Sequence, residues 1–124
     1  MLAPVSRPAV LVVDDDAAVR SALAFSLELQ GLDVTTCESG EALLLSDLPA
    51  ADACLVIDER LPGISGMETV RRLRDRNVAL PAILITTNPG PGLREAAREA
   101  GVPIVEKPLI GDALVAAICR ALKG

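Results

Sequence analysis

Two short apolar segments of the chain end directly on carboxylates, which are groups that can bind metal ions or act as nucleophiles. Val10–Val13 is followed by three aspartates at 14–16, and Leu55–Ile57 is followed by Asp58. Apolar runs without polar alternation are typical of parallel strands, which are covered on both faces. Ligands bind at the carboxyl ends of such strands. We therefore expect these aspartates to meet at one edge of one sheet.

Asp58 taken alone has two interpretations. It can simply open the turn that continues through Pro62 and Gly63, because aspartate is a common turn residue. It can also be a functional carboxylate delivered to the sheet edge by the strand before it. The second apolar run, with its own aspartates, favours the functional interpretation.

A cluster of carboxylates implies a cation, because like charges held close together repel unless a proton or a cation offsets them. Oxygen ligands on short loops suit a hard ion such as Mg²⁺, which also keeps some of its water ligands. One of the aspartates could then accept a phosphoryl group, and the ion would neutralise charge on the group in transfer. The cluster therefore predicts magnesium-assisted phosphoryl transfer to an aspartate.

Composition narrows the class of protein. The chain has 124 residues, 51% of them hydrophobic and 23% charged, which predicts one globular domain over residues 1–124. The net charge is -5 and Phe is the only aromatic residue, which argues against direct nucleic-acid binding. The chain has no His, so any phosphohistidine must come from a partner protein.

The cysteines and the first residues of the chain indicate the cellular compartment. Cys37, Cys54 and Cys119 are odd in number and widely spaced, so we interpret them as small buried apolar residues in a reducing compartment. Residues 1–8 lack the long apolar run of a signal peptide, and no apolar run could span a bilayer. We expect a cytoplasmic protein without membrane contact.

The chain alternates five strand patterns with five helix patterns, which predicts an α/β fold with a doubly wound parallel sheet and helices on both faces. We expect the strands at 10–13, 32–37, a segment ending at 58, 82–85 and 104–106. We expect the helices at 17–30, 39–46, from 65 onward, 93–100 and 111–122, with 88–92 as an irregular loop. Asp14, Asp58, Thr86 and Lys107 then lie at strand ends on one sheet edge.

The first predicted helix carries apolar residues on two sides. Val19, Leu23 and Leu27 are spaced by four and form the predicted core stripe. Phe25 and Leu29 lie on another side. We expect them to contact a neighbouring helix; a partner surface is the alternative.

From about Pro8 to Lys123 the chain resembles the receiver domain of two-component response regulators. Four motifs carry the resemblance: Val-Val-Asp-Asp at 12–15, Leu-Val-Ile-Asp at 55–58, Ile-Leu-Ile-Thr at 83–86 and Glu-Lys-Pro at 106–108. Segments 58–68 and 19–25 resemble the subfamily whose longer members carry a C-terminal helix-turn-helix output. The resemblance implies a flavodoxin-like sheet of strand order 2-1-3-4-5.

The resemblance also implies a phosphorylation and metal site. By analogy Asp58 takes the phosphoryl group. Asp15 and Asp58 would hold Mg²⁺ together with the backbone carbonyl of Arg60, and Asp14 would act through water.

The remaining roles concern the switch. Lys107 would pair with the phosphoacceptor, its bond to Pro108 would be cis, and Thr86 would move toward a phosphoryl oxygen. The chain departs from the family at Ile104, where an aromatic residue that rotates on activation is usual, and at Thr87, where a smaller residue is common. The segment 101–104 is also about one residue shorter than the usual spacing.

The leading hypothesis is a phosphoacceptor receiver, which takes phosphate from a sensor histidine kinase or phosphotransfer protein. It would signal to a downstream output protein or domain, through loop 87–92 with the adjoining helix and strand, and could dimerise on phosphorylation. It would be a switch rather than a turnover enzyme. A docking module that phosphorylation does not regulate stays open as the alternative. A phosphatase of the Asp-nucleophile type would need a second Asp where Arg60 stands.

Overall fold

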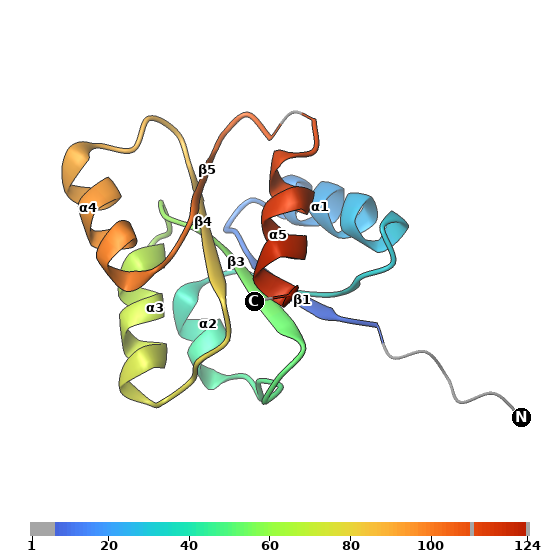
Figure 1. The fold of residues 1–124 in the computed structure, drawn as a ribbon, viewed down its shortest axis with the longest axis horizontal. Helices are drawn as coiled ribbons and strands as arrows, with labels where there is room; N and C mark the ends of the chain where they lie inside the picture. The colour runs from blue at the N-terminus through green and yellow to red at the C-terminus, as the bar shows by residue number, and fades with distance from the viewer. Residues whose placement is uncertain (1–6, 110, 124) are drawn as a thin grey trace, which may run out of the picture.

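The computed structural model describes residues 7–109 and 111–123, and its centre is one five-stranded parallel sheet (Figure 1). The strands are β1 (Ala9–Val13), β2 (Asp33–Cys37), β3 (Ala53–Asp58), β4 (Ala82–Thr86) and β5 (Ile104–Glu106). The helices are α1 (Ala17–Leu29), α2 (Gly40–Leu45), α3 (Gly66–Asp75), α4 (Pro91–Ala100) and α5 (Ala113–Lys123). The strand order β2-β1-β3-β4-β5 confirms the predicted fold.

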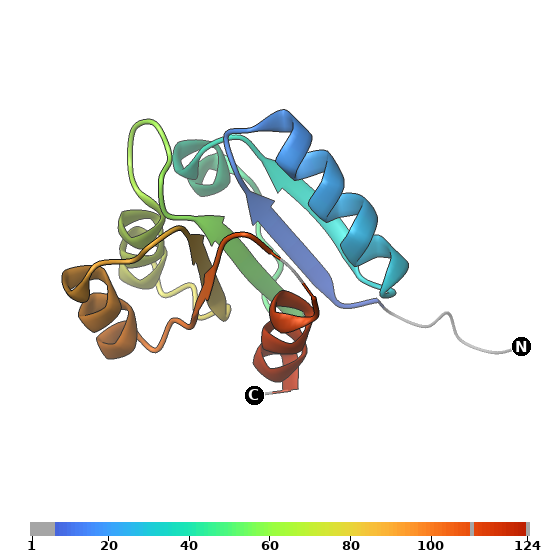
Figure 2. The same ribbon diagram turned by 90° about the horizontal axis from the view of Figure 1, so that it is seen from above.

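The sheet is covered on both faces, as its apolar strands require. Figure 2 shows α1 and α5 on one face and α2, α3 and α4 on the other. Alternate residues of each strand enter two separate cores, because successive side chains of a strand point to opposite faces. Leu55 and Ile57 pack with α2 and α3, whereas Cys54 and Val56 pack with α1 and α5. Every residue of β3 is buried, which places its last residue, Asp58, at the end of a rigid central strand.

Three of the helices begin at a residue whose side chain caps the helix, as the sequence predicts. Asp16 accepts hydrogen bonds from the N–H groups of Ala18 and Val19 at the start of α1. Ser39 and Ser65 cap α2 and α3 in the same way. Each cap satisfies N–H groups that have no partner inside the helix. All three capping residues lie in loops that follow the carboxyl ends of strands.

Helix α4 begins at Pro91, two residues before the predicted start, so the expectation that 88–92 is irregular throughout is wrong. Pro91 occupies the first turn, where a helix needs no N–H and the fixed φ of proline is already helical. Gly101 closes the helix with a φ of 70°, a left-handed conformation that glycine adopts without strain. The irregular connection between β4 and α4 therefore spans only 87–90.

Phe25 and Leu29 are 69% and 70% exposed, so the prediction that they contact a neighbouring helix is wrong. Leu23 and Leu27 are buried against the sheet. Two residues further along a helix a side chain points to nearly the opposite side, so Phe25 and Leu29 face away from the sheet. The spacing of apolar residues therefore identifies the side of the helix that faces the sheet. It does not show whether another helix covers the apolar residues on the opposite side.

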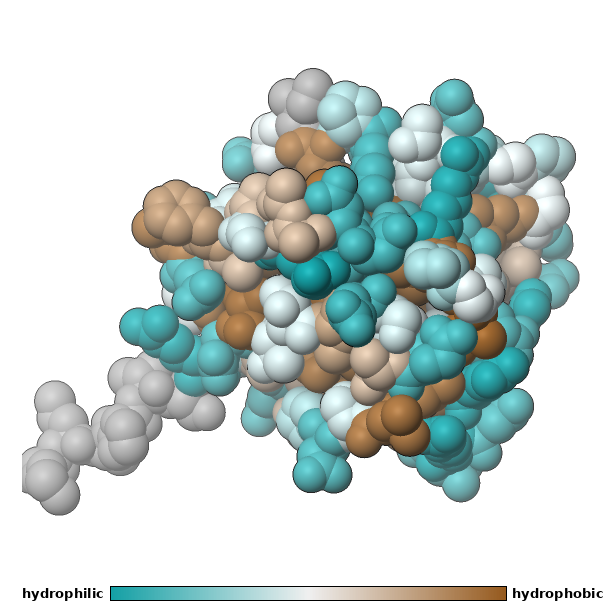
Figure 3. Space-filling model, turned by 180° about the vertical axis from the view of Figure 1, so that it is seen from behind, coloured by the Kyte–Doolittle hydropathy of each residue, from teal (hydrophilic) through white to brown (hydrophobic). Residues whose placement is uncertain are grey.

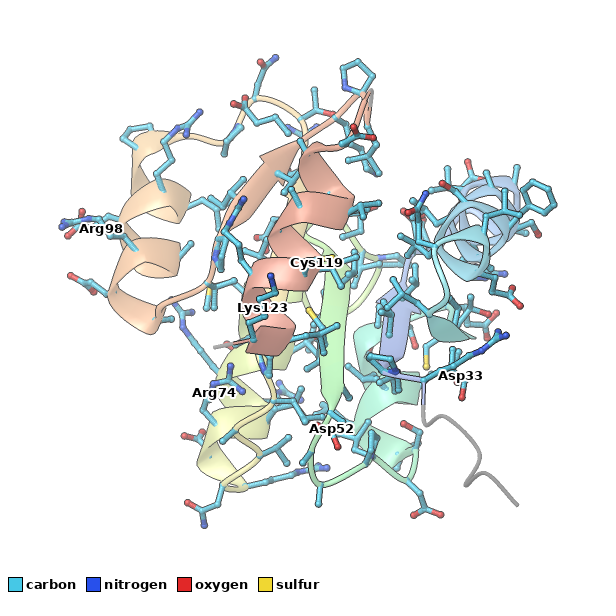
Figure 4. The ribbon with its side chains drawn as sticks, turned by 45° about the vertical axis from the view of Figure 1, so that its right-hand side comes forward. Asp33, Asp52, Arg74, Arg98, Cys119 and Lys123 are labelled. Carbon is cyan, nitrogen blue, oxygen red and sulfur yellow. The ribbon has the colours of Figure 1, made fainter. Side chains whose placement is uncertain are left out.

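The three cysteines differ in environment. Cys54 is buried, which raises the pKa of its thiol to about 12, and Cys37 is half-buried. Cys119, on α5 in Figure 4, is exposed, so the prediction of burial is wrong for this residue. It follows the inward-facing Ile118, and a neighbouring position on a helix faces another direction.

The outer surface is mixed in character. Arg98 projects from α4 away from the sheet and pairs with Glu95 (Figure 4). On the face seen in Figure 3, hydrophobic side chains form separate patches among hydrophilic ones. Among the helices of residues 7–109 and 111–123, none combines the length and apolarity needed to cross a bilayer.

Candidate functional site

Four strand ends bring the candidate side chains to one edge of the sheet. Asp14 directly follows β1, Asp58 ends β3, Thr86 ends β4, and Lys107 directly follows β5. Parallel pairing holds these ends in register, with Val13 opposite Ile57. The structure thus brings together the four residues that the strand pattern predicted.

Lys107 lies between two buried aspartates. Its Nζ donates to Asp58 Oδ2 at 3.1 Å and lies 3.5 Å from Asp14 Oδ2. Asp14 and Asp58 are only 1% and 5% exposed. Burial alone would lower the pKa of Lys107, but its hydrogen bond to Asp58 and the charges of both aspartates outweigh this and raise it. Lys107 is therefore a firmly charged ammonium beside Asp58.

Asp14, Asp15 and Asp58 form a group that fits a hard divalent cation. One carboxylate oxygen from each lies within 4.8 Å of the others. Asp14 Oδ2 is buried and has no hydrogen-bond partner among residues 7–109 and 111–123, and a buried acceptor without a partner is costly. Burial, followed by the charge of Asp58, raises the pKa of Asp14 against the opposing effects of the Asp16 N–H and Lys107. A bound Mg²⁺ would satisfy this oxygen and offset the repulsion.

The loop after β1 is fixed by hydrogen bonds to Asp14. The N–H of Asp14 donates to the carbonyl of Cys37 at 3.2 Å, and Asp14 Oδ1 accepts the N–H of Asp16 at 2.9 Å. Arg20, one turn into α1, donates from Nη1 to the Asp14 carbonyl at 2.7 Å. Arg20 was not predicted, because nothing in its spacing distinguishes it from a solvent-exposed arginine.

The loop after β3 contacts both Asp58 and the neighbouring loop. The N–H of Arg60 donates to Asp58 Oδ1 at 3.1 Å, which places the Arg60 peptide beside the acidic group. The Arg60 side chain donates from Nη2 to the Thr87 carbonyl at 3.4 Å. Arg60 therefore bridges the loops that follow β3 and β4.

Glu59 is a further residue that sequence reasoning missed. Its Oε1 accepts the N–H of Met67 at 2.8 Å, in the first turn of α3. Burial raises the pKa of Glu59, and the Asp58 charge adds to this, whereas the Met67 hydrogen bond and Arg71 oppose it. A carboxylate shortly before a capped helix was the available signal, but the contact depends on how the intervening loop folds.

The predicted switch residues lie on β4 and β5 or directly after these strands. Thr86 is 2% exposed, and its carbonyl accepts the N–H of Lys107 at 2.8 Å. Thr87 is exposed, and Ile104 is half-buried opposite Leu84. The bond between Lys107 and Pro108 is cis, as expected.

Comparisons with known proteins agree with this geometry. Residues 10–119 match the family described as the response regulator receiver domain. The chain is 40% identical to the transcriptional regulatory protein FixJ of Azorhizobium caulinodans, over 96% of this chain and 56% of that protein. It is 38% identical to the C4-dicarboxylate transport transcriptional regulatory protein DctD of Pseudomonas aeruginosa, over 92% of this chain and 25% of that protein. The chain thus spans about half the length, or less, of these relatives.

Solved structures give the same result. The response regulator StyR superposes with a TM-score of 0.87 at 34% identity, over 95% of this chain and 60% of that one. The structure FixJ-N superposes with a TM-score of 0.85 at 34% identity, over 96% of both chains. On its sequence, its strand order and the acidic group at its sheet edge, the chain belongs to the response regulator receiver domain family.

Proposed function

We propose that the chain is a phosphoacceptor switch in which Asp58 takes a phosphoryl group from the phosphohistidine of a sensor histidine kinase or phosphotransfer protein. The observation that carries this proposal is the buried Asp58 carboxylate, hydrogen-bonded to Lys107 and grouped with Asp14 and Asp15. A family match over residues 10–119 supports one receiver unit with its core at about 8–123. No observation favours the docking-module alternative.

The transfer is a substitution at phosphorus. An oxygen of Asp58 forms the new bond to phosphorus while the bond from phosphorus to the donor's imidazole nitrogen breaks, and the electron pair stays on that nitrogen. Bound Mg²⁺, held by Asp14, Asp15, Asp58 and the Arg60 carbonyl, would neutralise charge on the phosphoryl oxygens. Lys107 already lies at Asp58 Oδ2 and can donate to a phosphoryl oxygen without entering from solvent.

The conformational signal would pass from Thr86 to the output surface, which comprises loop 87–90, α4 and β5. The Thr86 carbonyl and the Lys107 N–H join the ends of β4 and β5, so a shift of Thr86 toward the phosphoryl group acts on both strands. Ile104 replaces the usual aromatic ring and has a stiff χ1. We therefore expect a smaller rearrangement, read by a downstream output protein or domain or by a second copy.

The same proposal places the chain in the cytoplasm with its kinase, as a switch that loses its own phosphoryl group rather than a turnover enzyme. The receiver match and the relatives that are transcriptional regulators support this placement.

Intact mass after incubation with acetyl phosphate tests the chemistry. The wild-type chain should gain one phosphoryl group only when Mg²⁺ is present, because charge at Asp58 must be neutralised. Asp58→Asn should gain none, while Asp47→Asn, at an exposed position outside the site, should match the wild type. Phosphorylation of Asp58→Asn at the wild-type level would show that the site is wrong.

Backbone amide shifts with and without beryllofluoride test the switch in the same protein. Changes should extend from residues 14–16 and 58–60 into residues 86–106. Silence of 86–106 would remove the proposed output surface and favour docking without a switch.

A further inference from the structure

The loop between β3 and α3, residues 59–65, begins at Glu59 and ends at Ser65. The first four N–H groups of a helix lack partners within it. In α3, Ser65 Oγ accepts one of them, from Glu68 at 3.1 Å, and the Ser65 carbonyl accepts the first intrahelical bond, from Thr69. Glu59 accepts two more of the unpaired groups, from Met67 through Oε1 at 2.8 Å and from Gly66 through its carbonyl at 3.1 Å.

Glu59 is itself fixed to the sheet, because its N–H donates to the carbonyl of Ile85 at 3.0 Å. The start of α3 lies directly on this backbone: a Cβ on Gly66 would come within 2.6 Å of the Asp58 carbonyl oxygen. Glu59, which directly follows Asp58, therefore connects β4 to the start of α3. The next peptide along the chain is that of Arg60.

The Arg60 peptide has two functions in this site. Its N–H holds Asp58 Oδ1 at 3.1 Å, and its carbonyl is the single main-chain ligand proposed for the cation. On the N-terminal side of Arg60, Glu59 is held by the hydrogen bond between its carboxylate and the Met67 N–H. On the C-terminal side, Ile64 donates its N–H to Glu41 Oε2 at 3.2 Å. Of these two hydrogen bonds, the one from Met67 to the half-buried Glu59 is the shorter and involves the residue next to Arg60.

We propose that Glu59 is a positioning residue for the cation site, which holds the Arg60 peptide in place by hydrogen-bonding the first turn of α3. This inference rests on the proposed function, since it assumes that the acidic group binds Mg²⁺. Glu59 acts by reach and not by charge: the carboxylate oxygen must span the distance to the Met67 N–H. Groups that orient metal ligands in this way change metal affinity when they are removed.

Charge and reach can be separated by two variants. Glu59→Gln removes the charge but keeps an acceptor oxygen at the same distance, whereas Glu59→Asp keeps the charge but is one methylene shorter. Mg²⁺ affinity of the unphosphorylated 124-residue chain is measured by titration calorimetry. We expect Glu59→Asp to weaken Mg²⁺ binding about tenfold, the lower end of the effect of outer-shell substitutions. Glu59→Gln should stay within about threefold of the wild type, because its oxygen still accepts the Met67 N–H.

Ser65→Ala is the matched control, because it removes the other side-chain cap of the same helix end and should cost about 1 kcal/mol of stability. It should leave Mg²⁺ affinity unchanged. Hydrogen exchange at the Met67 amide gives a second measurement, which should be faster in Glu59→Asp and unchanged in Glu59→Gln.

The possible results distinguish the positioning role of Glu59 from the proposed function. Equal Mg²⁺ affinity in Glu59→Asp and the wild type, or an equal loss in Ser65→Ala, overturns the positioning role alone. A greater loss in Glu59→Gln than in Glu59→Asp shows that charge rather than reach matters and also overturns it. A wild-type chain that binds no Mg²⁺ overturns the proposed function together with this inference.

Discussion

At the scale of single residues, the site contains more negative charge than its one ammonium can offset. Lys107 pairs with Asp58 and lies near Asp14, yet Asp14 Oδ2 still lacks a hydrogen bond. Without a cation the buried charge on Asp14 destabilises the fold, because burial in low dielectric disfavours a charged group. The buried charge of Asp14 therefore lowers the stability of the metal-free protein.

Asp14→Asn should therefore stabilise the metal-free protein at neutral pH. Burial raises the pKa of Asp14 above its ordinary value of 3.8, so the folded state binds this proton more tightly than the unfolded chain. The free energy of unfolding then falls as the pH rises above 3.8 until it passes the raised pKa. Asn retains an oxygen for the Asp16 N–H but carries no charge.

Urea unfolding of both proteins in EDTA at several pH values checks this. The advantage of Asp14→Asn should be large at pH 7 and should shrink below the ordinary carboxyl pKa, where Asp14 is protonated in both states. Asp47→Asn, at an exposed position, should show no such trend. An advantage that did not depend on pH would point to packing instead of charge.

At the scale of elements, the contact between α3 and the end of β3 fixes the loop that follows Asp58. Gly66 is the closest point, since an added Cβ would meet the Asp58 carbonyl oxygen, Leu84 Cδ2 and Glu59 Cα at 2.6, 2.9 and 3.0 Å. Two of these atoms belong to the backbone. They cannot rotate away, so α3 would have to shift.

Gly66→Ala should lower the free energy of unfolding by about 1–3 kcal/mol, the usual cost of forcing an extra methyl group into a packed contact. Gly92→Ala is the matched control: it lies in α4 with nothing within 4 Å of an added Cβ, and should stabilise by about 0.5–1 kcal/mol because alanine favours a helix. Equilibrium urea unfolding measures both. A neutral Gly66→Ala would mean that α3 is not firmly seated on β3.

The same elements show what the sequence could predict. The strands could be predicted because a strand covered on both faces must be continuously apolar, and Val10–Val13 and Cys54–Ile57 are. The start of α4 could not, because Pro91 and Gly92 are frequent in loops, and only the backbone shows that Pro91 occupies the first turn. Phe25 was misjudged because a pattern on one helix carries no information about its neighbours.

The candidate site divides in the same way. Asp14, Asp58, Thr86 and Lys107 could be predicted because parallel strands deliver their ends to one edge. Arg20 and Glu59 could not, since each contacts a main-chain group through a loop whose path depends on local geometry. Predictable residues are therefore those placed by sheet topology, and the missed ones are those placed by loops.

At the scale of the whole molecule, binding of a cation at the acidic group would be coupled to folding, because this group exists only when β1 and β3 are paired. A ligand that binds the folded state alone stabilises that state by mass action. Mg²⁺ should therefore raise the melting temperature, by an amount equivalent to about 2.7 kcal/mol at a hundred times its dissociation constant.

Thermal melts over a Mg²⁺ series, followed by far-ultraviolet circular dichroism, measure this effect. Asp15→Asn should reduce the shift, because it removes a ligand that is exposed and contributes little to the core. Asp47→Asn should leave the shift intact. A wild-type melting curve that did not move with millimolar Mg²⁺ would mean that the acidic group is not a cation site.

The strand order also determines when the site is completed during synthesis on the ribosome. β1 pairs with both β2 and β3, so the first half of the chain can assemble three neighbouring strands and bring Asp14 beside Asp58. Lys107 comes 49 residues after Asp58, and at about 5–20 residues per second it emerges roughly 2–10 s later. During that interval a nascent chain would hold two neighbouring carboxylates without their ammonium. Mg²⁺ bound at that stage would offset their repulsion until translation delivers β5.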